Sequence, residues 1–247
     1  MPTSSEEANE ILSLIAKEPY YSVRIAPTRA LEPVTLREAK RVVGDNAVRL
    51  RGWDFPHFES NDVHNGSSFA FSFVNWQRHV ELWRIYQSRQ FVYLGASWDT
   101  AMDFQEKLRK ELDHMLLPRP AAKESVAGLL SYIGVIYSVT EFYLFASRLA
   151  NELNYREYVR LEIALHNVDG WALASGDPRV LWHWLYQAHV KTIRIPAPDP
   201  SELFTEADAA SAAQKGLAVL FAGFNWEDSA GAIETWQRRL IERQFSD

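Results

Sequence analysis

The stretch RLRGWDFPHF, residues 49–58, gathers side chains that could do chemistry into one short run. It contains Arg51, Trp53, Asp54 and His57. Arginine and tryptophan dominate binding hot spots, whereas aspartate and histidine can bind metal ions or transfer protons. The run is therefore consistent with a recognition surface, with a metal centre, or with an internal ion pair between Arg51 and Asp54 beside a buried Trp53.

The first hypothesis is a non-enzymatic binding or sensor protein. We expect a groove in which an arginine supplies a fork of hydrogen-bond donors and aromatic rings supply rigid contact area. The expected site residues are Arg51, Trp53, Asp54, His57, Trp83, Tyr86 and Gln87. The ligand would be a protein or a small anionic molecule, and neither a catalytic residue nor a cofactor is assigned.

The second hypothesis is a metal-dependent hydrolase of the nuclease or phosphoesterase type. Asp54, His57 and His64 would hold the metal ion, because carboxylates and neutral imidazoles are ligands of zinc, iron and manganese. Glu81 would act as the general base. The spacing of these ligands matches no metal signature, and near Pro56 an aspartate usually caps a turn while a histidine binds backbone.

The third hypothesis is an accessory role in nucleic-acid binding. It depends on a basic cluster in the amino-terminal half, made of Arg37, Lys40, Arg41, Arg49 and Arg51. The formal net charge of −6 argues against a general nucleic-acid binder, since phosphate binding needs a positive surface. A solvated helix face is the commoner explanation of such a cluster, so this hypothesis ranks last.

The common catalytic motifs are absent from the sequence. There is no P-loop, no G-x-G-x-x-G, no G-x-S-x-G, no H-E-x-x-H and no calcium-binding loop. The sequence is rich in aromatic residues, with 9 Trp, 10 Tyr and 13 Phe. These indicate a well-packed aromatic core more strongly than an aromatic ligand cage.

Composition and hydropathy give expectations about location. Cysteine is absent, which excludes disulfides and thiolate sites and suits a reducing cytoplasm. The beginning of the sequence, MPTSSEEANE, is acidic and polar, so we expect no secretory signal. The longest stretch without charge, residues 125–140, is shorter than the ~20 apolar residues of a membrane-spanning helix. We therefore expect a cytoplasmic protein without a membrane segment.

Local patterns predict the elements of the amino-terminal half. YYSVRIAP alternates and predicts a strand over residues 20–25. Thr35 and Glu38 predict a capping box at the start of a helix that Gly44 ends, and VRLRGW predicts a second strand. Period-two alternation over residues 68–97 then predicts an antiparallel meander, although its middle segment also suits a short helix.

The carboxy-terminal half predicts more helix. Asp99 would cap a helix that ends near Pro118, and a very apolar helix would span about residues 126–151. REYVRLEIAL predicts a strand that forms a hairpin with VDGWALAS, and VKTIRIPAP predicts one more strand. Two helices, about residues 206–221 and 228–244, would end the chain.

These elements predict an α+β fold with a mostly antiparallel sheet, long core helices and a carboxy-terminal helical hairpin. We expect residues 1–19 to be a flexible segment and residues 20–247 to form a single domain. The hairpin, residues 200–247, should pack on that domain within the chain, with a two-fold dimer through the hairpin as the alternative. The protein is accordingly expected to be a monomer or a dimer.

Three motifs resemble those of a family of uncharacterised bacterial proteins. They are R-G-W-D-[FY]-P-H within residues 50–58, W-R-x-Y-Q-S-x-Q-F within residues 79–95, and T-E-x-x-x-F-A-x-R-L-A within residues 139–150. The resemblance extends from about Tyr20 to the last helix. Similar regions accompany DNA-binding domains of the Schlafen/AlbA-like type, which this sequence does not contain. The resemblance implies an accessory or sensor part of a bacterial regulatory or defence system and assigns no catalytic residue.

Overall fold

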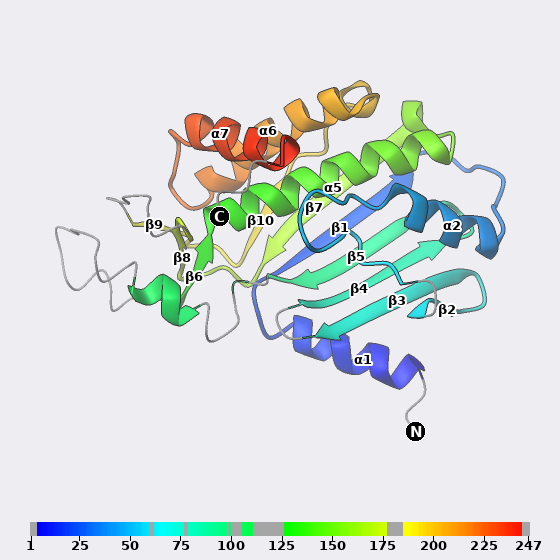
Figure 1. The fold of residues 1–247 in the computed structure, drawn as a ribbon, viewed down its shortest axis with the longest axis horizontal. Helices are drawn as coiled ribbons and strands as arrows, with labels where there is room; N and C mark the ends of the chain where they lie inside the picture. Colours follow the sequence, from blue (N-terminus) through cyan, green and yellow to red (C-terminus); the bar gives the residue numbers. More distant parts are fainter. Residues whose placement is uncertain are drawn as a thin grey trace.

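A seven-stranded sheet in the order β10-β7-β1-β5-β4-β3-β2 is the centre of the fold (Figure 1). The computed structural model describes residues 4–59, 62–76, 79–97, 99, 105–110, 126–176 and 185–243. Every neighbouring pair of strands in this sheet is antiparallel, which confirms the predicted α+β class. The strands are β1 (Tyr20–Pro27), β2 (His64–Asn65), β3 (Phe69–Trp76), β4 (His79–Tyr86), β5 (Phe91–Ala96), β7 (Val159–His166) and β10 (Thr192–Ile195).

β3, β4 and β5 form the meander that the alternation predicts, and the ambiguous middle segment is a strand. Trp83 on β4 lies opposite Ser72 on β3 and Tyr93 on β5. Because successive side chains point to opposite faces, Trp83 faces the main core and Leu82 faces a second, smaller core. The meander therefore needs helices on both faces.

Helices cover these two faces unequally (Figure 1). The long helix α5 lies along one face, with α2 beside it and α6 and α7 stacked on it, and α1 lies on the other face. α5 is buried along most of its length, because it lies between the sheet and the α6–α7 pair. The bounds are α1 (Ser4–Ile15), α2 (Leu36–Asn46), α5 (Tyr132–Glu152), α6 (Glu206–Ala222) and α7 (Ala230–Ile241).

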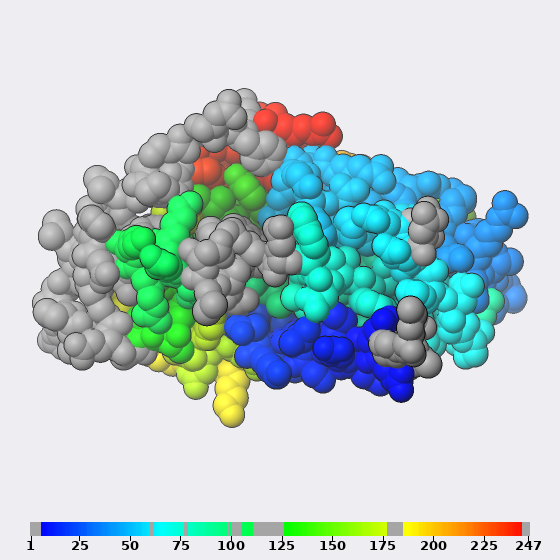
Figure 2. All heavy atoms as spheres, turned by 60° about the horizontal axis from the view of Figure 1, so that its bottom comes forward, coloured from blue at the N-terminus to red at the C-terminus, as the bar shows by residue number. Residues whose placement is uncertain are grey.

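Residues 4–15 form the helix α1, where the sequence analysis expects a flexible segment. Ala8, Ile11 and Ile15 are buried against Phe71 and Leu82. In the space-filling view α1 (blue) lies across cyan atoms of the strand region (Figure 2). The expectation missed this helix because its apolar residues recur at helical spacing among many polar ones, and only the sheet shows what they cover.

The segment before α5 differs from the sequence-based expectation. Residues 128–131 form the strand β6 (Gly128–Ser131), and α5 begins only at Tyr132, where Ser131 caps it by accepting from the N–H of Gly134. β6 pairs in parallel with β8 (Trp171–Ala174), which also pairs with β9 (Tyr186–Gln187) in a separate three-stranded sheet. The predicted hairpin of VDGWALAS with β7 is therefore wrong. Both edges of β7 are already paired, with β1 and β10.

Two further local predictions need correction. VRLRGW contributes one isolated bridge, between Val48 and Phe55, and no strand. Gly44 lies inside α2 and does not end it. Its missing side chain leaves room for the ring of Phe58, which a Cβ atom would approach to 2.7 Å.

The expected helix after Asp99 can be compared only in part. Residues 105–110 are helical, and the remainder of that segment lies outside the described residues. The carboxylate of Asp99 accepts from the N–H of Ser131 at 2.9 Å, at the end of β6. Asp99 thus joins two segments that are distant in the sequence.

The α6–α7 pair packs on α5, and a buried side-chain amide connects the three helices. Gln237 on α7 donates to Thr140 on α5 at 3.2 Å and to the carbonyl of Ala210 on α6 at 2.9 Å, and it accepts from Gln214 at 2.7 Å. A fully satisfied buried amide of this kind fixes the relative position of the three helices.

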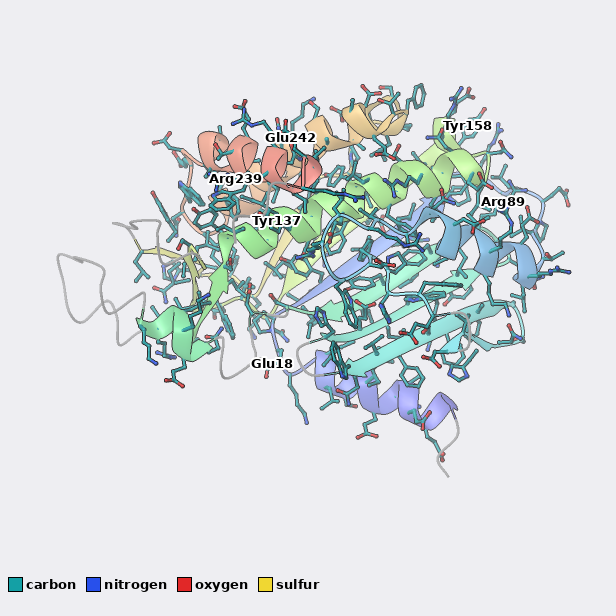
Figure 3. All side chains as sticks on the ribbon, in the orientation of Figure 1. Glu18, Arg89, Tyr137, Tyr158, Arg239 and Glu242 are labelled. Atoms are coloured by element: carbon teal, nitrogen blue, oxygen red, sulfur yellow. The ribbon has the colours of Figure 1, made fainter. Side chains whose placement is uncertain are left out.

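Arg89, in the turn between β4 and β5, ties the sheet to the carboxy-terminal end of α5. It donates to the carbonyl of Leu153 at 2.6 Å and to that of Glu32 at 3.1 Å. Figure 3 shows Arg89 and Tyr158 at the same end of the molecule, whereas Tyr137 lies far from them along α5. The sheet and α5 are therefore joined at one end, and the cavity described below lies toward the other. In the described part of the chain, no helix has the length and apolar character needed to cross a membrane.

The α6 interface offers a direct test of the packing. Phe221 is fully buried, whereas Val219 on the same helix is 43% exposed. We expect Phe221→Ala to lower the free energy of unfolding by about 3–5 kcal/mol, because it leaves a cavity in the core. Val219→Ala should change it by less than about 0.5 kcal/mol. Urea unfolding monitored by circular dichroism measures both, and equal effects would contradict this packing.

Candidate functional site

The RGWDFPH segment is held over the sheet by backbone pairing and by aromatic packing. Val48 and Phe55 exchange two backbone hydrogen bonds, of 2.7 and 3.0 Å. The ring of Phe55 packs against Phe142 and Tyr93, with centroid distances of 4.7 and 4.9 Å. The indole N–H of Trp83 donates to the carbonyl of His57 at 2.8 Å. These anchors fix both ends of the turn that carries Arg51 and Trp53.

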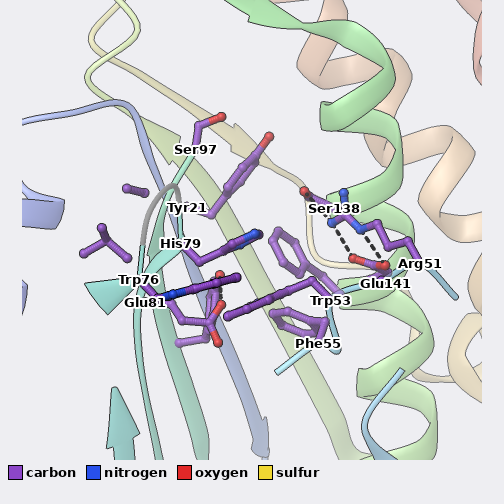
Figure 4. Close-up of a pocket in the computed structure, with 15 residues that line it drawn as sticks. Tyr21, Arg51, Trp53, Phe55, Trp76, His79, Glu81, Ser97, Ser138 and Glu141 are labelled. Carbon is purple, nitrogen blue, oxygen red and sulfur yellow. Dashed lines mark hydrogen bonds and ion pairs between the residues drawn. The ribbon is translucent and has the colours of Figure 1, made fainter. Parts of the chain in front are cut away.

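Arg51 forms a two-point ion pair with Glu141 on α5. Its Nε donates to Glu141 Oε1 at 2.9 Å and its Nη2 to Oε2 at 2.6 Å, while Nη2 also donates to Ser138 at 3.2 Å (Figure 4). The side chain of Glu141 is 1% exposed, so the pair is largely screened from water. Burial raises the pKa of Glu141, and the guanidinium of Arg51 opposes that rise. The Nε and Nη2 donors of Arg51 are thus occupied by the protein itself.

The three sequence motifs meet at this place. Arg51 belongs to the first, Glu141 to the third, and Trp83, which holds the carbonyl of His57, to the second. The pairs that join them are separated by 90 and 26 positions in the sequence. The motifs therefore describe one structural unit.

A cavity of about 370 Å³ opens beside the ion pair, between the sheet and the amino-terminal half of α5 (Figure 4). Its volume falls within the range of small-molecule sites, ~300–1,000 Å³. Figure 4 shows the rings of Trp53, Trp76 and His79 layered along one side and Arg51 with Glu141 on the other. The lining residues are Tyr21, Arg51, Gly52, Trp53, Phe55, Trp76, His79, Val80, Glu81, Tyr93, Ala96, Ser97, Ser138, Glu141 and Phe142.

Trp53 is the centre of a stack of flat rings. Its ring lies parallel to that of His79 at 3.8 Å between centroids, to that of His57 at 4.1 Å, and to that of Trp76 at 5.8 Å. Trp76 is 54% exposed, which is unusual for a residue of that size. The stack therefore forms a rigid aromatic wall that reaches from the cavity to solvent.

Glu81 is the second carboxylate of the cavity, and it is 5% exposed. It accepts from the backbone N–H of His57 at 3.0 Å and from the hydroxyl of Tyr93 at 3.2 Å. The indole N–H of Trp53 is close enough to favour the charged form, although it falls short of hydrogen-bond geometry and has no other partner in the described part of the chain. Burial outweighs these donors and raises the pKa of Glu81 to about 7.

Glu81 has no basic partner in the part of the chain that the structure describes. No lysine, arginine or histidine among the described residues lies within ion-pair distance of it, in contrast to Glu141. Gly95 on β5 makes the arrangement possible, because a Cβ atom there would collide with the hydroxyl of Tyr93. Among its described lining residues, the cavity therefore holds one ion pair, Arg51 with Glu141, and a further carboxyl group, Glu81, that no ion pair balances.

Asp99 is a third buried carboxyl group near this region. Its Oδ2 accepts from the N–H of Ser131 at 2.9 Å and from the hydroxyl of Ser97 at 3.4 Å. Burial raises its pKa to about 7, against the effect of these two bonds. Ser97 lines the cavity but Asp99 itself does not.

The structure separates the residues that the first hypothesis brings together. Arg51 and Trp53 line the cavity, and the ring of His57 stacks on Trp53. Three others lie elsewhere. Trp83 is buried in the core, Tyr86 packs on Phe69, and Gln87 donates to the carbonyl of Val34 at 3.2 Å. Asp54 pairs with Arg49 at 2.9 Å, not with Arg51.

The second hypothesis gains no support from the geometry. Among the described residues, no group of three His, Asp or Glu side chains could hold a metal ion. Asp54 is paired with Arg49, the Nε2 of His57 lies 3.3 Å from Glu59, and His64 stacks on Phe73. Glu81, expected as the general base, belongs to the cavity described above. Asp54, His57 and His64 therefore have separate structural roles.

Three of the five basic side chains on which the third hypothesis depends form ion pairs within the protein. Arg41 pairs with Asp45 and Glu152, Arg49 pairs with Asp54, and Arg51 pairs with Glu141. Such pairs reduce the positive potential that phosphate binding needs.

Some residues of the cavity escaped the sequence analysis. The sequence does contain a sign that Glu141 is functional or paired, because it is the one charged residue between Ser125 and Ser147 in a mostly apolar segment. Trp76, His79 and Tyr93 gave none, because a strand carries such residues equally well in a core.

Comparison with known proteins adds nothing to this geometry: no protein-family model, no curated protein and no solved structure matches the chain. The function must therefore be argued from the site.

The ion pair of Arg51 and Glu141 should be important for stability. We expect Arg51→Met to lower the free energy of unfolding by about 3–5 kcal/mol, because it leaves a buried carboxylate without a partner. Adding Glu141→Gln should recover most of this loss. Thermal and urea unfolding of both single variants and the double variant form a cycle, and additive effects would contradict the coupling.

The raised pKa of Glu81 predicts how stability depends on pH. The folded carboxyl group keeps its proton up to pH of about 7, whereas the unfolded one loses it near 4.5, so its contribution to stability falls as pH rises between these values. Glu81→Gln should remove that fall, which is on the order of 3 kcal/mol. Asp99→Asn should act in the same direction. Urea unfolding from pH 4.5 to 8 tests this; a difference between the Gln variant and the parent protein that does not change with pH would contradict it.

Proposed function

We propose that the protein is a non-enzymatic binding or sensor protein whose cavity takes a small organic cation. The observation that carries the proposal is Glu81, a buried carboxyl group without a basic partner among the described residues, in a cavity walled by parallel aromatic rings. Aromatic faces attract cations through their quadrupoles, and the attraction strengthens when water is excluded. A nearby carboxylate adds direct charge attraction.

A cation suits this cavity better than the anion expected from Arg51. The two-point bond to Glu141 takes up the guanidinium, and the two charges cancel. An anion that approached the remaining nitrogen of Arg51 would meet a charge that Glu141 already balances, and it would lie in the same cavity as the carboxyl group of Glu81. A cation would instead lower the pKa of Glu81 and stabilise its ionised form. Its attraction to the carboxylate offsets part of the free-energy cost of burying that charge.

The motif resemblance supports a setting for such binding. It implies an accessory or sensor part in a bacterial regulatory or defence system, which we propose acts in the cytoplasm. A small-ligand sensor in that setting would recognise its ligand without changing it. The aromatic wall extends to the surface at Trp76. A partner protein that contacts Trp76 could therefore detect whether the cavity holds a ligand.

Calorimetric titration with choline, and with its neutral isostere 3,3-dimethylbutan-1-ol, tests the proposed ligand class. We expect choline to bind and the neutral alcohol to bind at least about tenfold more weakly, because only the cation pairs with Glu81. The affinity for choline should rise roughly tenfold between pH 6 and pH 8, as the group with a pKa of about 7 ionises.

Two variants make this experiment specific. Glu81→Gln keeps the shape of the side chain and should abolish both the preference for the cation and the pH dependence. Asp99→Asn removes a buried carboxyl group of similar pKa that does not line the cavity, and it should keep both. Equal affinity for the two ligands in the parent protein would rule out the cation site.

A further inference from the structure

Among the described residues, the outer edge of β3 is only partly covered by another strand. β2 is two residues long and pairs with Ala70 and Phe71 alone. The carbonyl of Phe69 accepts from Gly66 on the outer side, whereas that of Ser68 accepts from Gln87 on the side of β4. In an antiparallel ladder these directions alternate along a strand.

The alternation fixes which backbone groups are open. The N–H and C=O groups of Phe73 and Asn75 point away from β4, toward the outer edge. No strand in the described part of the chain pairs with either residue on that side. An edge with unpaired backbone groups is a template for another strand, and natural proteins usually cover or charge such edges.

A groove of about 660 Å³ lies along this edge, between β3 and the segment after Gly52. Its walls include Ser72, Phe73, Val74, Asn75 and Trp76 from β3. Neighbouring strands need a spacing of about 4.8 Å, so a groove of this size has room for several residues of extended chain. The space continues past Trp53 and Trp76, the same rings that form the wall of the inner cavity.

The groove is acidic. Asp54, Glu59 and Asp62 line it, and neither lysine nor arginine does so among the described residues. Asp54 has Arg49 as an ion-pair partner, and among the described residues Glu59 has the ring of His57, at 3.3 Å, as its one such partner. A second copy of this chain would bring the same carboxylates against each other. Charge complementarity therefore favours a basic partner.

We propose that the edge of β3 binds an extended, basic peptide segment of a partner protein by adding it to the sheet as a further strand. Backbone bonds to Phe73 and Asn75 give the affinity. Alternate side chains of the peptide lie on opposite faces: basic ones toward the carboxylates of the groove, and apolar ones beside Phe71 and Phe73, where α1 covers the sheet. Neither the open edge nor the acidic lining involves Glu81, so peptide binding here does not require a cation in the inner cavity.

The probe is a fluorescein-labelled peptide of alternating Lys and Val, seven residues long, titrated with the full chain and followed by anisotropy. We expect it to bind at least about tenfold more tightly than the peptide in which Glu replaces Lys, and to weaken with added salt. Equal binding of the two peptides, or no binding at ~1 mM protein, overturns the proposal.

A matched pair of variants tests the backbone contact. Asn75→Pro removes an outward N–H and leaves the ladder with β4 intact, since proline is tolerated at sheet edges. Asn75→Ala removes the same side chain but keeps the N–H. We expect the proline variant to bind roughly tenfold more weakly than the alanine variant. Similar affinities for the two folded variants contradict a strand-like mode of binding.

Two further measurements keep the test decisive if Asn75→Pro fails to fold. Peptides N-methylated at every Lys or at every Val block alternate backbone amides, and one of the two should lose binding while the other retains it. Loss of neither overturns the proposal. Light scattering of the parent protein detects self-association, and a dimer that dissociates when the Lys–Val peptide is added assigns the edge to a second copy and overturns the peptide as its occupant.

Discussion

The ion pair between Arg51 and Glu141 is the constraint on which the arrangement of the site depends. It joins the segment between α2 and β2 to the middle of the most buried helix, where the side chain of Glu141 is 1% exposed and the loss of Arg51 would leave a buried carboxylate without a partner. Once Arg51 is fixed, the turn that follows must lie over the sheet. Trp53 then stacks on the side chains at the ends of β3 and β4.

The ion pair also decides the chemistry of the cavity. Because the pair balances one positive and one negative charge, Glu81 is the remaining carboxyl group among the described residues that line the cavity. Its hydrogen bonds come from a backbone N–H and from Tyr93, so they orient the carboxyl group without neutralising it. Binding sites typically contain buried polar groups that form hydrogen bonds with the protein on one side and face a cavity on the other. At a position that served stability alone, an apolar residue would avoid the cost of burying a carboxyl group.

The aromatic wall connects the interior of the protein to its surface. Trp53 and Trp76 border both the inner cavity and the outer groove beside β3. Any group that enters one space therefore contacts rings that also face the other. The partly covered edge of β3 and the acidic lining of the groove are features of the surface, whereas the cavity belongs to the core. Their common wall gives the two sites a direct physical contact.

The sequence by itself determined many of the local elements, although not α1, β6 or the single bridge at Val48. Alternation identified β1, the β3–β5 meander, β7 and β10, and Thr35 marked the start of α2, because these patterns arise from the geometry of a single segment. Only the tertiary structure decided the partners. In the folded chain Arg51 pairs with a residue 90 positions away, and β8 pairs with β6 because β7 has no free edge. The helix α1 packs on a face of the sheet that no local pattern specifies. The tertiary structure also buried Glu81, and burial is a property of everything that surrounds a group, which no spacing along the chain encodes.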